Sequence, residues 1–192
     1  MNQLDSDDWA DPVEPPITYA ICDIRGRLQA TLVRHPDKGF AWYDATGRLG
    51  LGGISVCSLP LYGSDLLRRI PVDTMIVLVE GAKAAQALRR CAIPALATIT
   101  GAAVTPSRAV LDVLHGRPVT LWPDNDRVGR DHMCRIGELL LDIASEVWWI
   151  EPDPRLPVGG DAADVPPDEL AWHFDRAVKF RANSRASRVS ST

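Results

Sequence analysis

The sequence predicts an α/β protein with a mostly parallel sheet flanked by helices and preceded by a small β-rich subdomain. Two observations support this prediction. Over residues 71–180, short apolar runs alternate with stretches of helical periodicity, which is the pattern of βαβ units. Over residues 17–70, strand-like segments are separated by glycine-rich turns instead. We expect a disordered acidic lead, residues 1–16, and a disordered basic tail, residues 181–192.

Three strands are predicted in the β-rich subdomain. Residues 17–24 and 27–34 have strand character on either side of the turn Arg25-Gly26. Residues 40–43 form a third, shorter candidate. Irregular chain is expected beyond it, because four glycines follow closely: Gly47, Gly50, Gly52 and Gly53.

Four buried strands are predicted in the α/β part. The first, residues 75–79, is a short, continuous apolar run, which suits a parallel strand covered on both faces. The candidates are residues 75–79, 95–99, 119–122 and 146–150. Because parallel strands are joined by right-handed helical crossovers, we expect helices between them.

Four stretches are predicted to be helical. In the first, apolar residues recur at the spacing i, i+3, i+4 and i+7: Ala84, Ala87, Leu88 and Cys91. The second is predicted to begin at Thr105-Pro106, with threonine as the N-cap and proline in the first turn, and to end near Leu114. Apolar residues at helical spacing mark the third: Met133, Ile136, Leu140 and Ile143. The fourth is an amphipathic stretch over residues 168–180.

Composition excludes several classes of protein. The chain has 192 residues, of which 46% are hydrophobic and 24% charged, as is typical of a globular protein with its own core. No run approaches the roughly 18 apolar residues of a membrane span, so no membrane partner is expected. The lead has no apolar segment of the secretory kind. Four cysteines without a Cys-x-x-Cys pair argue against structural zinc and fit a reduced, cytoplasmic setting.

Charge is distributed unevenly along the chain. Residues 1–16 hold five acids and no base, whereas residues 176–192 hold five bases and no acid. The 20 acids and 16 bases between them give the body the same formal charge, −4, as the whole chain. This balance excludes a strongly basic protein that coats nucleic acid, but it allows contact with nucleic acid at one local site.

Carboxylates follow three of the four predicted parallel strands. They are Glu80 after the first strand, Asp124 and Asp126 after the third, and Asp161 and Asp164 in the loop beyond the fourth. Because the carboxyl ends of parallel strands lie at one edge of a sheet, we expect these acids to gather there. Mg²⁺ takes oxygen ligands, usually one or two carboxylates plus phosphate oxygens and water. The pattern therefore indicates a Mg²⁺ or Mn²⁺ site at this edge.

Each of these acids has a simpler explanation when it is taken alone. Glu80 before a glycine is a common turn residue, and Asp124 and Asp126 suit an Asx-turn or a helix cap. Asp161 and Asp164 would be ordinary solvated loop acids. Their recurrence at equivalent positions after three strands favours a shared site.

Four neighbouring residues are candidate phosphate contacts: Gly81, Lys83, Arg127 and Arg130. Gly81 would let the chain turn tightly into the following helix, whose N-terminus would then face a phosphate. For the three cationic residues, the alternative is a solvated, charged helix face.

Three motifs together resemble the TOPRIM domain: VEG after one strand, WPDNDRVGRDHM after another, and GGDAADV in the last loop. They are most similar to the TOPRIM module of phage and plasmid primases and primase-helicases. The resemblance covers about residues 73–166, and LPLYGSDLL at 59–67 is similar to the lead-in segment of phage-type members. It implies a TOPRIM-like, Rossmann-like fold, with Glu80 as general acid/base or metal contact and Asp124 and Asp126 as Mg²⁺ ligands.

The resemblance also implies Mg²⁺-dependent phosphoryl or nucleotidyl transfer on DNA or RNA during replication of a phage or mobile element. Nucleotides are candidate substrates, and a separate helicase or polymerase is a candidate partner. A nuclease that uses the same acids is one alternative. A non-catalytic module that binds nucleic acid or a replication partner is another, which is favoured by Ala82, where the family usually has an acid.

Two related functions are disfavoured by the residues themselves. The chain has no Gly-x-x-x-x-Gly-Lys-Ser/Thr motif, so a P-loop helicase motor is not expected. A topoisomerase needs a tyrosine nucleophile on a separate domain, and the three tyrosines all fall in the β-rich subdomain: Tyr19, Tyr43 and Tyr62.

Overall fold

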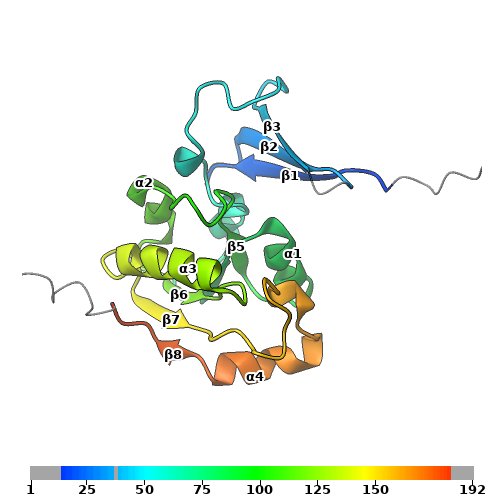
Figure 1. The fold of residues 1–192 in the computed structure, drawn as a ribbon. Helices are drawn as coiled ribbons and strands as arrows, with labels where there is room; N and C mark the ends of the chain where they lie inside the picture. The colour runs from blue at the N-terminus through cyan, green and yellow to red at the C-terminus, as the bar shows by residue number, and fades with distance from the viewer. Residues whose placement is uncertain (1–13, 37–38, 183–192) are drawn as a thin grey trace, which may run out of the picture.

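The computed structural model of the protein describes residues 14–36 and 39–182. They form a three-stranded antiparallel sheet that lies above a five-stranded, mostly parallel sheet with helices on both faces (Figure 1). This arrangement confirms the predicted fold class. Most of the predicted acidic lead and basic tail, residues 1–13 and 183–192, lies outside the described residues.

The three-stranded sheet has the order β1-β2-β3, with β1 at Ile17–Cys22, β2 at Leu28–Arg34 and β3 at Phe40–Asp44. The turn between β1 and β2 contains Gly26 at φ +80°, a left-handed conformation that glycine adopts at little cost. The Asp23 carboxylate holds this turn together by accepting hydrogen bonds from two of its backbone N–H groups. The sequence thus located all three strands to within about two residues at each end.

The five-stranded sheet has the order β5-β4-β6-β7-β8. Its strands are β4 (Ile76–Val79), β5 (Ala95–Ala97), β6 (Pro118–Leu121), β7 (Glu146–Trp149) and β8 (Val178–Lys179). The first four are parallel and correspond to the four predicted strands. β4 and β6 are direct neighbours, so the loops that follow them emerge side by side.

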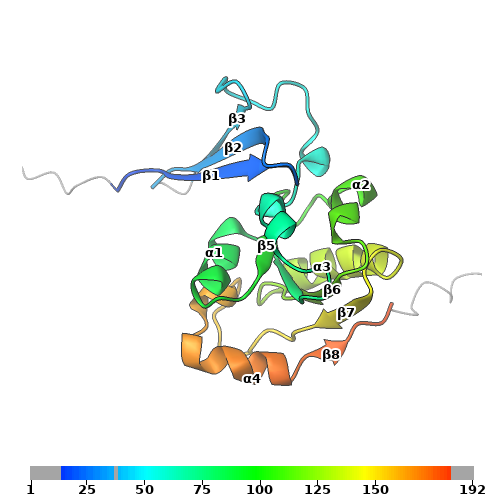
Figure 2. The same cartoon turned by 180° about the vertical axis from the view of Figure 1, so that it is seen from behind.

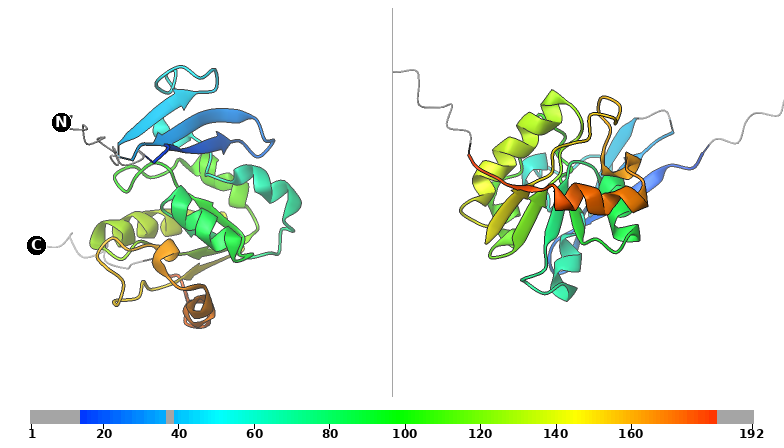
Figure 3. Two further views of the ribbon diagram at one scale, coloured as in Figure 1. Left: turned by 90° about the vertical axis from the view of Figure 1, so that its right-hand side faces the viewer. Right: turned by 90° about the horizontal axis from the view of Figure 1, so that it is seen from below.

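Helices cover both faces of this sheet: α1 (Ala82–Arg90), α2 (Arg108–Leu111), α3 (Arg127–Leu140) and α4 (Leu170–Asp175). Side chains alternate along β4, so Ile76 and Leu78 pack in the core beneath α2 and α3, whereas Val77 and Val79 pack with α1 and α4. Figure 3 shows α3 and α1 on opposite sides of the sheet. Burial on both faces explains why β4 is apolar throughout.

The helix predicted over residues 168–180 is shorter than expected. α4 ends at Asp175, and the chain then extends as β8, antiparallel to β7. The Phe180 N–H donates to the carbonyl of Val147 over 2.9 Å, and the Phe180 ring lies 5.8 Å from that of Trp149. Pairing with the edge of the sheet and aromatic packing therefore override the helical pattern at its C-terminal end.

The second predicted helix begins later than expected. α2 starts at Arg108 behind the N-cap Ser107, and a 3₁₀ turn at Asp112–Leu114 continues it. The Thr105 hydroxyl accepts a hydrogen bond from Arg135 Nε over 3.1 Å, so it is engaged by α3 and does not cap. A tertiary contact thus displaces the predicted start.

Residues 56–70 connect the two sheets. Two 3₁₀ turns, Val56–Ser58 and Ser64–Arg69, lie in this segment, and the second lies between β1 and β5 in Figure 2. Leu61 and Leu67 pack in the core of the five-stranded sheet, and Tyr62 exchanges two backbone hydrogen bonds with β5. Within residues 14–36 and 39–182, no helix is both long and apolar enough to span a membrane.

Candidate active site at the carboxyl edge of the sheet

Glu80 and Asp124 meet where β4 and β6 end. Glu80 directly follows β4, and Asp124 follows β6 with two residues between it and the end of the strand. The Glu80 Oε1 atom accepts a hydrogen bond from the Asp124 N–H over 3.0 Å. Two residues that are 44 positions apart are thus held in contact by the pairing of neighbouring strands.

Asp126 is the N-cap of α3, and its Oδ1 accepts from the Gly129 N–H over 2.7 Å. The helix-cap explanation is therefore correct for Asp126, although its position also places it in the site. A Cβ at residue 129 would collide with the Glu80 carboxylate and would lie 3.1 Å from the Asp124 Cβ. Glycine at this position lets the first turn of α3 approach both acids closely.

Burial and like charges both disfavour ionised carboxylates at this edge. Burial, with Glu80 as the strongest charged neighbour, raises the pKa of Asp124 to about 8. The charges of Asp161, Asp126 and Asp164 add to this effect. Burial also raises the pKa of Glu80, although the N–H of Asp124 opposes the shift. Such a site favours a proton or a bound cation, and strongly shifted pKa values are typical of functional sites.

Asn125, between the two aspartates, ties the last loop to the site. Its N–H donates to the Gly160 carbonyl over 2.8 Å, and its own carbonyl accepts from the Gly159 N–H. Its side-chain amide donates to the Leu156 carbonyl over 2.8 Å. The sequence analysis did not single out Asn125. The available signal is its position between two aspartates, because an amide side chain can donate a hydrogen bond to a backbone carbonyl and an ionised carboxylate cannot.

Asp161 and Asp164 form a capping box on the 3₁₀ turn Ala162–Asp164. Lys83, in the first turn of α1, lies 3.7 Å from Asp161 and 3.3 Å from Asp164. The backbone N–H of Asp161 lowers the pKa of Asp164, and Lys83 contributes to the shift. Asp161 and Asp164 are therefore more than solvated loop acids, because their hydrogen bonds order the loop. Their negative charges also act on the site, since they raise the pKa of Asp124.

The three cationic candidate phosphate contacts differ in their exposure to solvent and in the acids that they pair with. The Arg127 side chain is 92% exposed and pairs with Asp131 at 3.5 Å. Arg130 is anchored by Glu151 at 2.9 Å and by the side-chain oxygen of Asn125. Lys83 is half exposed beside its two acids.

Gly81, at φ −127° and ψ 146°, is extended and not tightly turned as predicted. Any residue adopts this conformation, and a Cβ here would meet open space. Its lack of a side chain leaves room next to Glu80.

Glu80, Asp124 and Asp126 line one cavity of about 260 Å³ together with Gly81 and Gly101. We call it the acidic cavity. Within the described part of the chain, no group of three or more histidines, cysteines and acids is arranged so that it could hold a metal ion by itself. The donors present fit Mg²⁺ held by one or two carboxylates with substrate oxygens and water, and they do not fit a closed, zinc-like cage.

Solved primase structures share this fold. The E. coli primase catalytic core covers 92% of the chain at 20% identity with a TM-score of 0.63. A DNA primase domain from Pseudomonas aeruginosa gives the same three values. The primase fragment of the bacteriophage T7 primase-helicase covers 82% at 20% identity with a TM-score of 0.53. This chain has a primase-like TOPRIM fold.

The chain spans little more than half of these primase structures, between 56% and 58% of their lengths. No protein-family model and no curated protein sequence matches it. The likeness to solved primase structures confirms the TOPRIM fold that the sequence motifs implied. Within that fold, the predicted site acids line one cavity, and the loop acids lie close enough to raise the pKa of Asp124.

Proposed function

We propose that this protein is a primase-type TOPRIM enzyme that catalyses Mg²⁺-dependent nucleotidyl transfer on nucleic acid in DNA replication. The contact between Glu80 and Asp124 at neighbouring strand ends supports the proposal most strongly. The proposal is also supported by likeness to primase catalytic domains, one of which is described as bound to single-stranded DNA.

Asp124 and Asp126 would hold Mg²⁺, or Mn²⁺ in its place, through carboxylate oxygens. When bound, the ion would polarise the phosphate that is attacked and stabilise the charge that develops on it. Glu80, whose pKa is raised by burial, would accept the proton of the attacking hydroxyl as a general base. Lys83 and Arg127, the more exposed basic residues, would contact nucleic-acid phosphates.

The proposal also includes the replication system in which the protein acts. The likeness to a phage T7 primase fragment supports replication of a phage or mobile element in the cytoplasm. In this setting a separate helicase or polymerase would act together with the protein. Nucleotides would be the substrates, and single-stranded DNA the template.

A non-catalytic TOPRIM module that binds nucleic acid or a replication partner is the second candidate. Ala82 favours it, because it packs in the core beneath the three-stranded sheet at a position where the family usually has an acid. A nuclease would use the same acids as a primase. Products distinguish the three: extended oligonucleotides, shortened ones, or bound nucleic acid without either.

The test is ribonucleotide incorporation on a single-stranded DNA template with Mg²⁺ or Mn²⁺. The parent should synthesise oligonucleotides, and Asp124→Asn should abolish synthesis. Asp142→Asn is the matched control, because Asp142 is exposed and pairs with Arg108 outside the acidic cavity. Equal synthesis by the parent and Asp124→Asn would refute the assigned site.

A further inference from the structure

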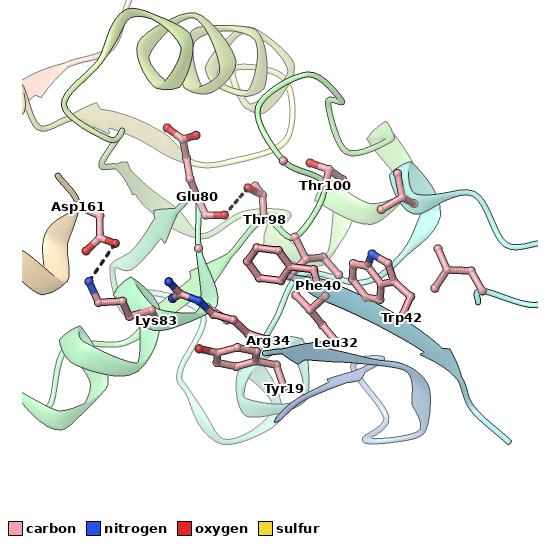
Figure 4. Close-up of a pocket in the computed structure, with 16 residues that line it drawn as sticks. Tyr19, Leu32, Arg34, Phe40, Trp42, Glu80, Lys83, Thr98, Thr100 and Asp161 are labelled. Carbon is pink, nitrogen blue, oxygen red and sulfur yellow. Dashed lines mark hydrogen bonds and ion pairs between the residues drawn. The ribbon is translucent and has the colours of Figure 1, made fainter. Parts of the chain in front are cut away.

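The backbone of Glu80 is held by a side chain that follows the neighbouring strand. Glu80 lies one residue beyond β4, and the Thr98 N–H, one residue beyond β5, donates to the Val79 carbonyl over 2.9 Å. The Thr98 hydroxyl then donates to the Glu80 carbonyl over 3.2 Å, as Figure 4 shows at the wall of a cavity of about 610 Å³ between the two sheets. Within the described residues, no other hydrogen bond is made to the Glu80 backbone.

The directions of these hydrogen bonds fix the tautomer of His132. The Thr98 Oγ1 atom also lies 3.3 Å from the His132 Nε2 atom. Because a carbonyl oxygen can only accept, the single hydroxyl proton of Thr98 is used toward Glu80, and its oxygen must accept from His132. Burial lowers the pKa of His132 to about 4, so the ring is neutral at neutral pH and carries its one proton on Nε2.

The fold alone gives no reason for an imidazole at position 132. His132 is fully buried, and its Nδ1 atom has no hydrogen-bond partner among the described residues. A buried polar atom without a partner lowers the stability of a fold. Its buried neighbours on α3, Met133 and Ile136, are apolar, so an apolar side chain would suit the core equally well. The bond from Nε2 to Thr98 is the contact that an apolar side chain could not make.

This contact joins the two elements that carry the site acids. His132 lies in the second turn of α3, the helix that Asp126 caps. The Glu80 carboxylate points away from Thr98 in Figure 4 and accepts from the Asp124 N–H over 3.0 Å. Glu80 is thus held at its carbonyl by Thr98 and at its carboxylate by Asp124. Loss of the first contact would let the carboxylate move within the acidic cavity.

We propose that His132 is a positioning residue for Glu80. Its Nε2–H group orients the Thr98 hydroxyl, which holds the Glu80 carbonyl and so sets where the Glu80 carboxylate lies. A displacement of about 1 Å in a reacting group can lower a rate about a hundredfold. The effect on position rests on the contacts alone, whereas its consequence for catalysis rests on the proposed function.

The position of Glu80 can be measured without any activity, because the Asp124 N–H donates to its carboxylate. In the presence of chelator, nitrogen NMR of the His132 ring should find the proton on Nε2. Exchange of the Asp124 amide proton should be about five- to tenfold faster in Thr98→Val and in His132→Leu, as for the loss of one hydrogen bond. The double variant should be no faster than either single one, since both act along one path. Thr98→Ser should keep the parent's rate, because it keeps the hydroxyl.

Thr120→Val is the matched control for the change from threonine to valine. Thr120 is 2% exposed, as buried as Thr98, but its hydroxyl donates to the sulfur of Met75, which precedes β4. It should leave the exchange of the Asp124 amide unchanged. The Phe180 amide, which donates to the Val147 carbonyl, reports on the rest of the sheet and should exchange at the parent's rate in both variants at positions 98 and 132.

Synthesis separates this inference from the proposed function. In an active enzyme, Thr98→Val should lower kcat and leave the KM for ribonucleotides unchanged, and an unchanged kcat would overturn the positioning role. A parent that makes no oligonucleotides would refute the enzyme proposal, while amide exchange would still decide the position of Glu80. A proton on Nδ1 of His132, an unchanged Asp124 exchange rate in Thr98→Val, or equal acceleration at Asp124 and Phe180 would overturn the inference.

Discussion

At the scale of single residues, Asp124 is held in place at a cost to stability. Burial and the neighbouring carboxylates raise its pKa to about 8, so its ionised form is disfavoured in the fold. Asp124→Asn should therefore raise the melting temperature of the metal-free protein by a few degrees, at about 2–4 °C per kcal/mol for a chain of this size. Asp142→Asn should change the free energy of unfolding by no more than about 0.5 kcal/mol. A lower melting temperature for Asp124→Asn would instead mean that its carboxylate stabilises the fold.

His132 gives the stability a predictable dependence on pH. It is fully buried beside the Thr98 hydroxyl, and burial lowers its pKa from 6.5 to about 4. Between these values the unfolded chain binds a proton that the folded chain does not, so the contribution of His132 to stability should fall as the pH falls from 6.5 to 4. The raised pKa of Asp124 contributes in the opposite direction over this range. Urea unfolding at several pH values isolates the His132 contribution: the difference in stability between the parent and His132→Gln should change by this amount between pH 6.5 and 4. Parallel curves for the two proteins would rule out this residue as the source.

At the scale of elements, the approach of α3 to the strand ends depends on Gly129. In an ordinary helix position, Gly→Ala stabilises by about 0.4–1 kcal/mol. Here the added Cβ would collide with Glu80, so Gly129→Ala should destabilise by about 1–3 kcal/mol and also lower any synthesis. Gly81→Ala is the control for stability, because its backbone is extended and its Cβ would be free. Chemical denaturation of both variants measures the difference, and a stabilised Gly129→Ala would contradict the packing.

Elements buried on two faces could be predicted from the sequence, whereas those set by tertiary contacts could not. β4 is apolar throughout because helices cover both of its faces, and Glu80 follows it directly. β8 has only two residues, and it depends on the edge of β7 for its pairing. The start of α2 depends on a bond from Arg135 to Thr105. The cavity of about 610 Å³ between the three-stranded sheet and the carboxyl edge of the five-stranded sheet forms only when the two sheets are placed together, and no local sequence pattern encodes that.

At the scale of the whole molecule, the acidic body limits how nucleic acid can bind. Its formal charge of −4 predicts weak binding that depends on a few local cations and falls with salt. Log affinity falls with log salt, and Lys83→Ala and Arg127→Ala should each reduce the magnitude of this negative slope by about 0.7–0.9. Lys179→Ala, which removes a cation paired with Glu146 at the edge of the sheet, should alter it less. Affinity that stays constant from low to high salt would contradict phosphate contacts.

The central claim is that Asp124 and Asp126, beside Glu80, form a cation site on the folded protein. Thermal melting with Mg²⁺ or Mn²⁺ and with chelator tests it most directly, because an ion that binds only the folded chain stabilises it by mass action. At ten times the dissociation constant the gain is about 1.4 kcal/mol, or a shift of roughly 3–6 °C. The parent should show this shift, and the double variant Asp124→Asn with Asp126→Asn should lose it. A parent that does not shift at millimolar metal, together with a destabilised double variant, would show that the two aspartates serve the fold alone.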